Sequence, residues 1–464
     1  LLLVVCSSGA NITTGRWRLA NADVKSAFLQ GKPEPRRERL FMKSPRDPII
    51  QAAGVWPADY YEVTGNIYGL ANASWTFCTE VMRRMKERDF DQHSLDPMLF
   101  MHRDMGILDC LILFHVDDAL ITWSPDFDIK VIKDMFVWGS WHQLHEEGCS
   151  ALVFTGREIR QQENGTIRVN QLKYILSTQL GKIDTKGLPD EELCGPLKTE
   201  FRSCIGSLQY VAGSTRPDIC APTSLSQKSK VGPQELQQAY NAMLYLHDTA
   251  DVCIVIPPIN LSNAMVVAYG DSSFANADGC KTQVGILIAI TERRAMSQVC
   301  PACPVDWRGC RTQRVVRSTL AGEAIACDTG CDHGVYVASM LSEIINGQSV
   351  VRGHTTYTRR ATTQCHIEVK SITDCRSLYD ALQKVAPSID EKRTLIDVLG
   401  IKETVGRDGV NWMPTDKQLA DALTKIDFNL SMKLVQWLGR PALCLRKTSE
   451  EVSTPVQVNE DPFV

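Results

Sequence analysis

Two apolar runs on either side of a pair of adjacent carboxylates constrain this chain more than any other feature. Apolar residues dominate 111–116 and 119–121, and Asp117 and Asp118 lie between the two runs. Short apolar runs interrupted in this way predict a strand, a tight turn and a second strand, with the acids at the tip of a hairpin. Because Asp is common in turns, a hairpin without chemistry is one interpretation.

A bound cation is the other interpretation of the hairpin tip. Neighbouring carboxylates repel one another and are costly to desolvate, so a pair at the end of a buried strand favours a cation. Carboxylate oxygens suit a hard ion such as Mg²⁺, which binds through one or two carboxylates and substrate phosphates. A second stretch, 22–31, places Asp23 at the end of a short segment, ahead of Phe28 and a glycine turn. The two stretches together favour a metal site.

These motifs resemble the reverse transcriptase palm of copia-type LTR retrotransposons. The Pol polyproteins of that family carry D-V-K-x-A-F-L-x-G and later Y-V-D-D, and this chain has 23–31 and 115–118 in their places. The resemblance implies that Asp23, Asp117 and Asp118 bind two metal ions, which stabilise the attacking and leaving oxygens of phosphoryl transfer.

The resemblance also implies two nucleotide-binding residues. Phe28 would lie beneath the incoming sugar and exclude a 2′-hydroxyl. The segment 66–75 resembles the family's L-Y-G-L-K-Q-x-P-x-x-W, and Asn72 stands where the family has a Gln that reaches the nucleotide. The shorter amide predicts weaker positioning of the nucleotide.

The last third of the chain carries a second ordered set of acids. Asp271 and Asp374 end predicted strands, Glu323 lies one turn into a helix that begins near Ser318, and Asp421 lies on a helix that begins near residue 416. This order resembles the RNase H domain of the same polyproteins and implies that the four acids bind two further metal ions. The motif around Asp374 is a looser match than the other three.

The resemblance covers residues of about 15 to 430 and implies an α+β polymerase palm and thumb followed by an α/β RNase H-like domain with a mixed sheet. The expected domains are a palm with truncated fingers, a thumb or connection, an RNase H domain, and a tail that is disordered at its end. Their ranges are 1–160, 161–258, 259–430 and 431–464.

Composition bears on nucleic-acid binding. The 464 residues carry a net charge of −4, which is unexpected because phosphate binding relies on Lys and Arg. Basic runs at 36–39, 83–88 and 308–317 could supply local positive surfaces or could be solvated helix faces. The 17 cysteines are scattered, which favours reduced thiols. No stretch is long and apolar enough to predict a membrane span.

The predicted function is RNA-directed DNA synthesis together with hydrolysis of RNA in an RNA–DNA hybrid. The resemblance implies Mg²⁺ or Mn²⁺ as cofactor, two ions per active site, and an RNA template, a DNA primer, an RNA–DNA hybrid and deoxynucleoside triphosphates as partners. Other Pol or Gag segments of the same element could also bind. The expected location is cytoplasmic virus-like particles with access to the nucleus. Two alternatives stay open, an inactive remnant that keeps the fold and a chain active only as RNase H.

Overall fold

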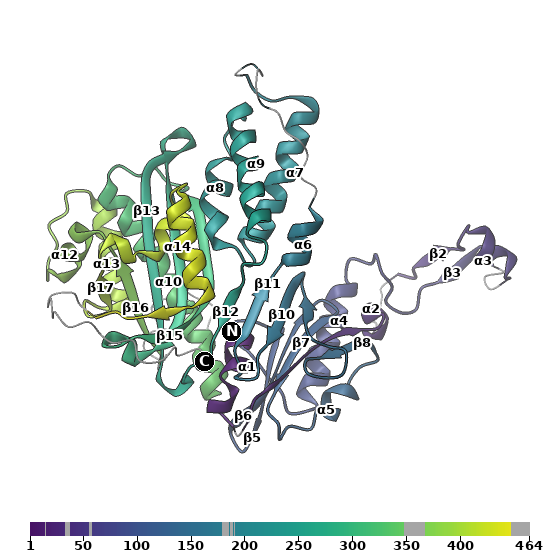
Figure 1. Ribbon diagram of the computed structural model, residues 1–464. Helices are drawn as coiled ribbons and strands as arrows, with labels where there is room; N and C mark the ends of the chain where they lie inside the picture. The colour runs from purple at the N-terminus through teal and green to yellow at the C-terminus, as the bar shows by residue number, and fades with distance from the viewer. Residues whose placement is uncertain are drawn as a thin grey trace. The chain divides into compact units, whose positions relative to one another are not determined.

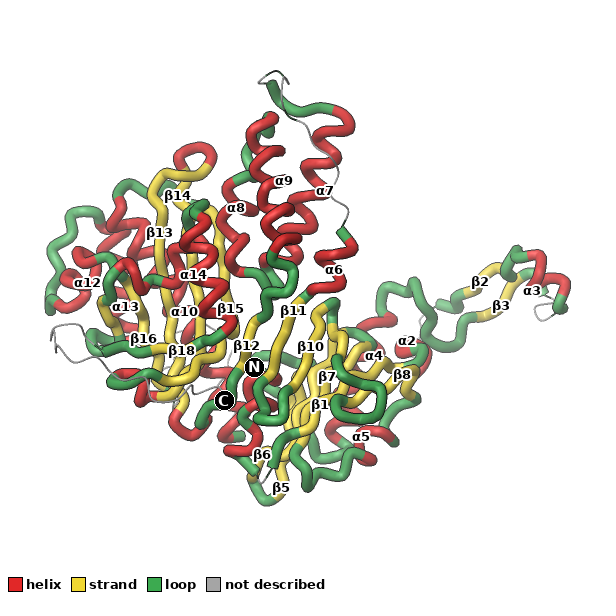
Figure 2. Tube along the Cα trace, viewed as in Figure 1, coloured by secondary structure: helices red, strands yellow, loops and turns green. Residues whose placement is uncertain are grey.

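The computed structural model describes residues 1–13, 15–32, 38–54, 58–178, 185, 189, 191–347 and 367–446. The chain forms two compact units, one of Arg18–Cys149 and one that joins Leu1–Trp17 to Ser150–Val464. Figure 1 shows the elements of each unit, and Figure 2 shows their helices and strands by colour. No helix among the described residues is long and apolar enough to cross a membrane.

The unit Arg18–Cys149 is built on a six-stranded antiparallel sheet with the order β4-β5-β6-β7-β1-β8. The predicted hairpin is present as β6 and β7. Helix α4 (Ala73–Lys86) packs against the sheet because Phe77, Val81 and Met85 recur at helical spacing and are fully buried. The strands are β1 (Arg18–Val24), β4 (Asp91–Gln92), β5 (Leu99–Asp104), β6 (Ile107–His115), β7 (Asp118–Trp123) and β8 (Trp138–Gln143).

Smaller elements complete this unit. Helix α2 follows β1 directly and contacts α4. Strands β2 and β3 form a separate antiparallel pair. The bounds are α2 (Ala27–Gln30), β2 (Phe41–Lys43), α3 (Pro48–Ala52), β3 (Tyr60–Glu62) and α5 (Lys130–Lys133).

The second unit begins with a four-stranded antiparallel sheet of order β12-β11-β10-β9 and a group of helices. Helix α9 contacts both α7 and α8. The elements are α1 (Leu2–Ser7), β9 (Leu152–Phe154), β10 (Arg157–Gln161), β11 (Ile167–Asn170), α6 (Leu172–Ser177), α7 (Gly195–Ala212), α8 (Cys220–Leu225), α9 (Pro233–Asp248) and β12 (Ile254–Ile256).

A six-stranded mixed sheet with the order β17-β16-β13-β14-β15-β18 forms the rest of this unit. Strands β13, β14 and β15 are an antiparallel meander, and β16 and β17 continue the sheet in parallel with β13. The strands are β13 (Ala264–Ala277), β14 (Lys281–Glu292), β15 (Cys300–Arg311), β16 (Glu368–Thr373), β17 (Val410–Trp412) and β18 (Ala442–Leu443).

Helices flank this mixed sheet. The long helix α10 packs along β13, β14 and β16, and α13 packs on α10. The elements are α10 (Thr319–Asn346), α12 (Arg376–Gln383), α13 (Lys392–Val405), the 3₁₀ helix η7 (Leu419–Leu423) and α14 (Phe428–Gly439). A meander followed by a crossover helix and two parallel strands is an RNase H-like topology, so the predicted fold class is confirmed.

Two of the predicted domain limits lie inside observed elements of the structure. The limit at 160 lies inside β10, whose ladder joins it to β9 and β11. The limit at 430 lies inside α14, and β18 beyond it pairs with β15. The basic pair at 36–37 and the end of the predicted tail, residues 447–464, lie outside the described residues.

Candidate active sites

The three palm acids meet where β1 lies beside the β6–β7 hairpin. Asp23 is directly opposite Asp118 in the antiparallel ladder, and Asp117 lies in the turn before β7. Val116 has a φ of +60°, the left-handed conformation that lets the chain reverse within the tight turn. The amide of Val24 donates to the carbonyl oxygen of Asp117 at 2.9 Å, which ties the turn to β1. The structure therefore brings all three predicted residues to one place.

Burial and mutual repulsion perturb the palm acids. Burial raises the pKa of Asp23, and the charges of Asp117 and Asp118 raise it further. Burial also raises the pKa of Asp118, with a further increase from Asp117 and an opposing effect of His115. Gly139 on β8 leaves room for this group, because a Cβ there would lie 2.8 Å from Oδ2 of Asp23. Three acids in such a position are stabilised by a bound cation.

The two predicted nucleotide-binding residues lie in the same unit. Phe28 on α2 contacts the ring of Tyr68, with 4.9 Å between ring centroids, and Phe77 at 6.3 Å. Tyr68 is exposed, so this aromatic pair forms part of the surface. Asn72 directly precedes α4, and its side chain makes no capping hydrogen bond to that helix.

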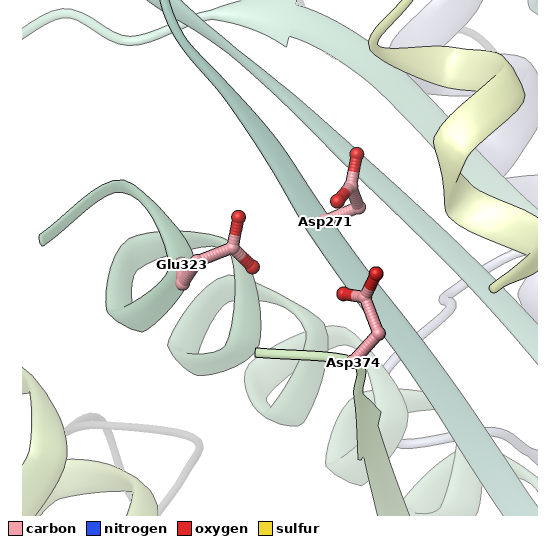
Figure 3. Close-up of side chains that lie close together, drawn as sticks. All are labelled: Asp271, Glu323 and Asp374. Carbon is pink, nitrogen blue, oxygen red and sulfur yellow. The ribbon is translucent and has the colours of Figure 1, made fainter. Parts of the chain in front are cut away.

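The second group of acids consists of three residues that come from different parts of the fold, as Figure 3 shows. Asp271 lies on β13, Glu323 on α10, and Asp374 directly after β16. One ligand atom from each lies within 4.8 Å of the others, and this three-acid cluster is the only such group of potential metal ligands in the part of the chain that the structure describes. The parallel pairing of β13 and β16 brings Asp271 and Asp374 to the same edge of the sheet.

The pKa values of Asp271 and Glu323 indicate that a bound cation would stabilise the charged form of the three-acid cluster. Burial raises the pKa of Asp271 to about 8, and Glu323 and Asp421 add to the increase. Burial raises the pKa of Glu323 to about 7, although the hydrogen bonds from Ser272 act to lower it. The amide and hydroxyl of Ser272 donate to Oε1 of Glu323 at 3.3 and 2.8 Å, whereas Oε2 is buried without a hydrogen-bond partner. A buried carboxylate oxygen without a partner fits a metal ligand.

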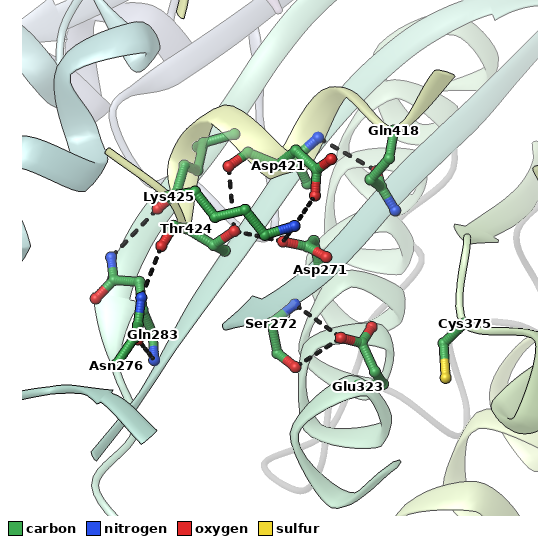
Figure 4. A network of polar contacts seen from close by, with 12 residues as sticks. Asp271, Ser272, Asn276, Gln283, Glu323, Cys375, Gln418, Asp421, Thr424 and Lys425 are labelled. Atoms are coloured by element: carbon green, nitrogen blue, oxygen red, sulfur yellow. Dashed lines mark hydrogen bonds and ion pairs between the residues drawn. The ribbon is translucent and has the colours of Figure 1, made fainter. Parts of the chain in front are cut away.

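Asp421 has a different environment from the other three acids. It lies on η7, is buried, and accepts a hydrogen bond from Nζ of Lys425 at 2.5 Å. The same Nζ lies 3.8 Å from Oδ2 of Asp271, and the hydroxyl of Thr424 donates to that oxygen, as Figure 4 shows. Burial lowers the pKa of Lys425, but the charges of Asp271 and Asp421 raise it overall. Sequence reasoning missed Lys425, although its spacing of four residues from Asp421 could have indicated the pair.

Two glycines let η7 lie close to the sheet. In the ladder Asp271 is opposite Gly285, and Gly285 is opposite Gly309 on β15. A Cβ at Gly285 would lie 2.8 Å from Cγ2 of Thr424, and one at Gly309 would lie 2.8 Å from the carbonyl oxygen of Leu423. The absence of these two side chains places Asp421 beside Asp271.

Known proteins resemble this chain in sequence, most clearly over its first part. Residues 9–187 match the reverse transcriptase (RNA-dependent DNA polymerase) family model. A transposon Ty5-1 protein of Saccharomyces cerevisiae is 26% identical over 248 residues, which are 50% of this chain and 77% of that protein. The retrovirus-related Pol polyprotein from transposon RE1 of Arabidopsis thaliana is 26% identical over 345 residues, which are 71% of this chain and 22% of the polyprotein.

Among solved structures, a foamy viral protease–reverse transcriptase in complex with an RNA/DNA hybrid matches 89% of this chain and 45% of its own chain. Its TM-score is 0.43 and its identity 11%, so the fold assignment rests on strand order and register instead.

The family match and the palm acids define the first part of the chain as a reverse transcriptase domain. The relatives confirm the resemblance that the motifs indicated, to the Pol polyproteins of copia-type retrotransposons. The chain spans 22% of the Arabidopsis polyprotein.

Proposed function

We propose that this chain combines two phosphoryl-transfer activities, DNA synthesis in the palm unit and hydrolysis of the RNA strand of an RNA–DNA hybrid in the RNase H-like domain. The observation that carries the second activity is the convergence of Asp271, Glu323 and Asp374 on an RNase H-like sheet, with one oxygen of Glu323 left without a partner.

The three-acid cluster would hold Mg²⁺ or Mn²⁺. When bound, such an ion supplies positive charge to the phosphate and lowers the pKa of a water molecule. The protein's own groups orient the ligands: Ser272 fixes Oε1 of Glu323 and leaves Oε2 available, and Thr424 fixes one oxygen of Asp271. Contacts to 2′-hydroxyls and phosphates would select the hybrid over duplex DNA without reading its sequence.

The proposed polymerase site uses Asp23, Asp117 and Asp118 as ligands for the same type of ion, with deoxynucleoside triphosphates and a primer on a template as substrates. The family match of residues 9–187 and the ladder that places Asp23 opposite Asp118 support it. Phe28 with Tyr68 would form the surface beneath the nucleotide.

The RNase H proposal is tested by Glu323→Gln in the full chain, with an end-labelled RNA in a hybrid and Mg²⁺. The change keeps the shape of the side chain and removes one ligand charge, so we expect cleavage to fall by about a hundredfold or more. Glu368→Gln is the matched control, because Glu368 is exposed at the opposite end of β16 from Asp374. Equal cleavage by wild type and Glu323→Gln would refute the assignment.

The polymerase proposal is tested by primer extension on an RNA template with Asp118→Asn. We expect extension to fall by about a hundredfold or more, since one metal ligand is lost. Asp126→Asn, at an exposed position shortly after β7, should extend like wild type. Extension by Asp118→Asn at the wild-type rate would contradict the proposal, and folded wild type that performs neither reaction would favour an inactive remnant.

A further inference from the structure

Lys425 is the one basic side chain that forms an ion pair with the RNase H-like acids among the residues the structure describes. Its ammonium group lies 2.5 Å from Oδ1 of Asp421 and 3.8 Å from Oδ2 of Asp271. The side chains of both acids are 3% exposed, whereas that of Lys425 is 39% exposed. Figure 4 shows the ammonium group between the two carboxylates.

The lysine divides the four acids into two groups. In the described part of the chain no ion pair includes Glu323 or Asp374, and the charge of Lys425 acts on these two acids only from beyond ion-pair distance. Asp421 is absent from the three-acid cluster and is neutralised by Lys425 instead. An ion that enters the three-acid cluster therefore does not have to disturb Asp421.

We infer that Lys425 fills a cation position between Asp271 and Asp421 in the metal-free protein, and that a second divalent ion binds there only by displacing it. This inference rests on the proposed function, because it takes the three-acid cluster as the place of the first ion. It makes Lys425 a positioning residue that sets how many ions the site holds at a given concentration.

The backbone around Lys425 is held firmly, which limits how the displacement can occur. Asn276 on β13 donates to the carbonyl oxygen of Thr424 at 3.0 Å, and Gln283 on β14 donates to that of Leu423 at 3.2 Å. Gln418 donates to the carbonyl oxygen of Gly270 at 3.0 Å. Because the segment is fixed to the sheet from both sides of η7, Lys425 leaves by rotation of its partly exposed side chain and Asp421 stays in place.

The test is a calorimetric titration of the full chain with Mn²⁺ in Lys425→Met and its parent. All proteins carry Asp118→Asn to weaken binding at the palm acids. We expect the parent to bind one ion at the RNase H-like acids and a second more weakly, and Lys425→Met to bind the second about tenfold more tightly or better, because a competing charge is gone. Lys425→Gln, which keeps a polar end, should give the same result if Lys425→Met does not fold.

Two controls and a second readout separate this from a purely structural role. Lys425→Arg keeps the charge and should retain weak binding of the second ion. Lys417→Met removes an exposed charge from the same region and should bind like the parent. Without metal, Lys425→Met should unfold at a lower temperature than the parent, and saturating Mn²⁺ should remove most of that difference.

The outcomes distinguish the inference from the proposed function. Unchanged affinity for the second ion in Lys425→Met and Lys425→Gln would overturn the inference while leaving the proposed metal site intact. Binding of the first ion that is insensitive to Asp374→Asn, or no binding at all, would overturn the proposed site and the inference with it.

Discussion

Gly139 shows at the scale of a single residue how a missing side chain positions a carboxylate. A Cβ at this position would lie 2.8 Å from Oδ2 of Asp23. Cβ atoms in proteins essentially never lie this close to another heavy atom. The ladder between β1 and β8 shifts register between Asp23 and Val24, whose partners are Ser140 and Trp138, so Gly139 is the extra residue of β8 at this bulge. The carboxylate of Asp23 therefore occupies space that only glycine at 139 leaves open.

Gly139→Ala should impair the polymerase while leaving the fold intact. The new methyl group forces the carboxylate of Asp23 to turn, and a displacement of about 1 Å at a reacting site costs roughly a hundredfold in rate. We expect primer extension to fall by about that factor, with a change of about 1 kcal/mol or less in the free energy of unfolding. Gly65→Ala, where no atom lies within 4 Å of the new Cβ, is the control. Extension equal to that of wild type would show that Asp23 does not need its observed orientation.

At this scale the sequence indicated which acids lie together, but not which other residues lie beside them. Asp23, Asp117 and Asp118 lie together because short motifs specify both a strand end and a turn. Asp374 came from the loosest motif and still lies with Asp271 and Glu323. Gly139 and Lys425 were missed, because a glycine or a lysine has no distinctive pattern until the fold brings it beside a carboxylate.

At the scale of elements, α14 and β18 are part of the RNase H-like domain, although the sequence placed most of α14 and all of β18 in a tail. Strand β18 has two residues, too few to show a strand pattern, and its pairing with β15 spans more than a hundred residues of sequence. Four leucines of this segment are buried, namely Leu434, Leu438, Leu443 and Leu445. Long-range pairing of a short strand is the kind of contact that local patterns do not predict.

Truncation of the full chain tests the contribution of these elements. A chain that ends at residue 430 loses the four buried leucines, each worth about 1.5–3 kcal/mol, so the total approaches the stability of a whole domain. We expect its RNase H-like domain to be unfolded, with far-ultraviolet circular dichroism and limited proteolysis as measurements. A chain that ends at residue 446 keeps all described residues and should behave like the full chain. Equal resistance of the two truncated chains to protease would show that α14 and β18 are dispensable.

At the scale of the whole molecule, the charge of −4 leaves few places for nucleic acid to bind. The basic run 83–88 is partly neutralised, since Glu80 accepts hydrogen bonds from Arg83 and Arg84. This pairing holds the pKa of Glu80 at about 2. In the run 308–317, Arg314 is paired with Asp397, but Arg308 and Arg311 line a cavity of about 830 Å³ between α7, α8 and β15. Of the described basic runs, the one on β15 is therefore the better candidate for phosphate contacts.

The salt dependence of hybrid binding tests this candidate. Each lost phosphate contact reduces the slope of log affinity against log salt by about 0.7–0.9, so the double change Arg308→Gln and Arg311→Gln should reduce it by roughly 1.5. Binding is measured in the Asp374→Asn background to prevent cleavage. Lys392→Gln with Arg393→Gln on α13 removes the same charge from another exposed surface and should leave the slope unchanged. An unaltered slope in the β15 variant would exclude phosphate contacts from these two arginines.

Gly285 and Gly309 form a strip of backbone without side chains. This strip bears on which related sequences can assemble the four acids. Because a methyl group at either position would collide with the segment that carries Asp421, a copy can retain all four acids and still be unable to assemble them. A survey that scores only the acids would count such a copy as intact. To judge whether a genomic copy can still form this site, both glycines have to be inspected together with the four acids.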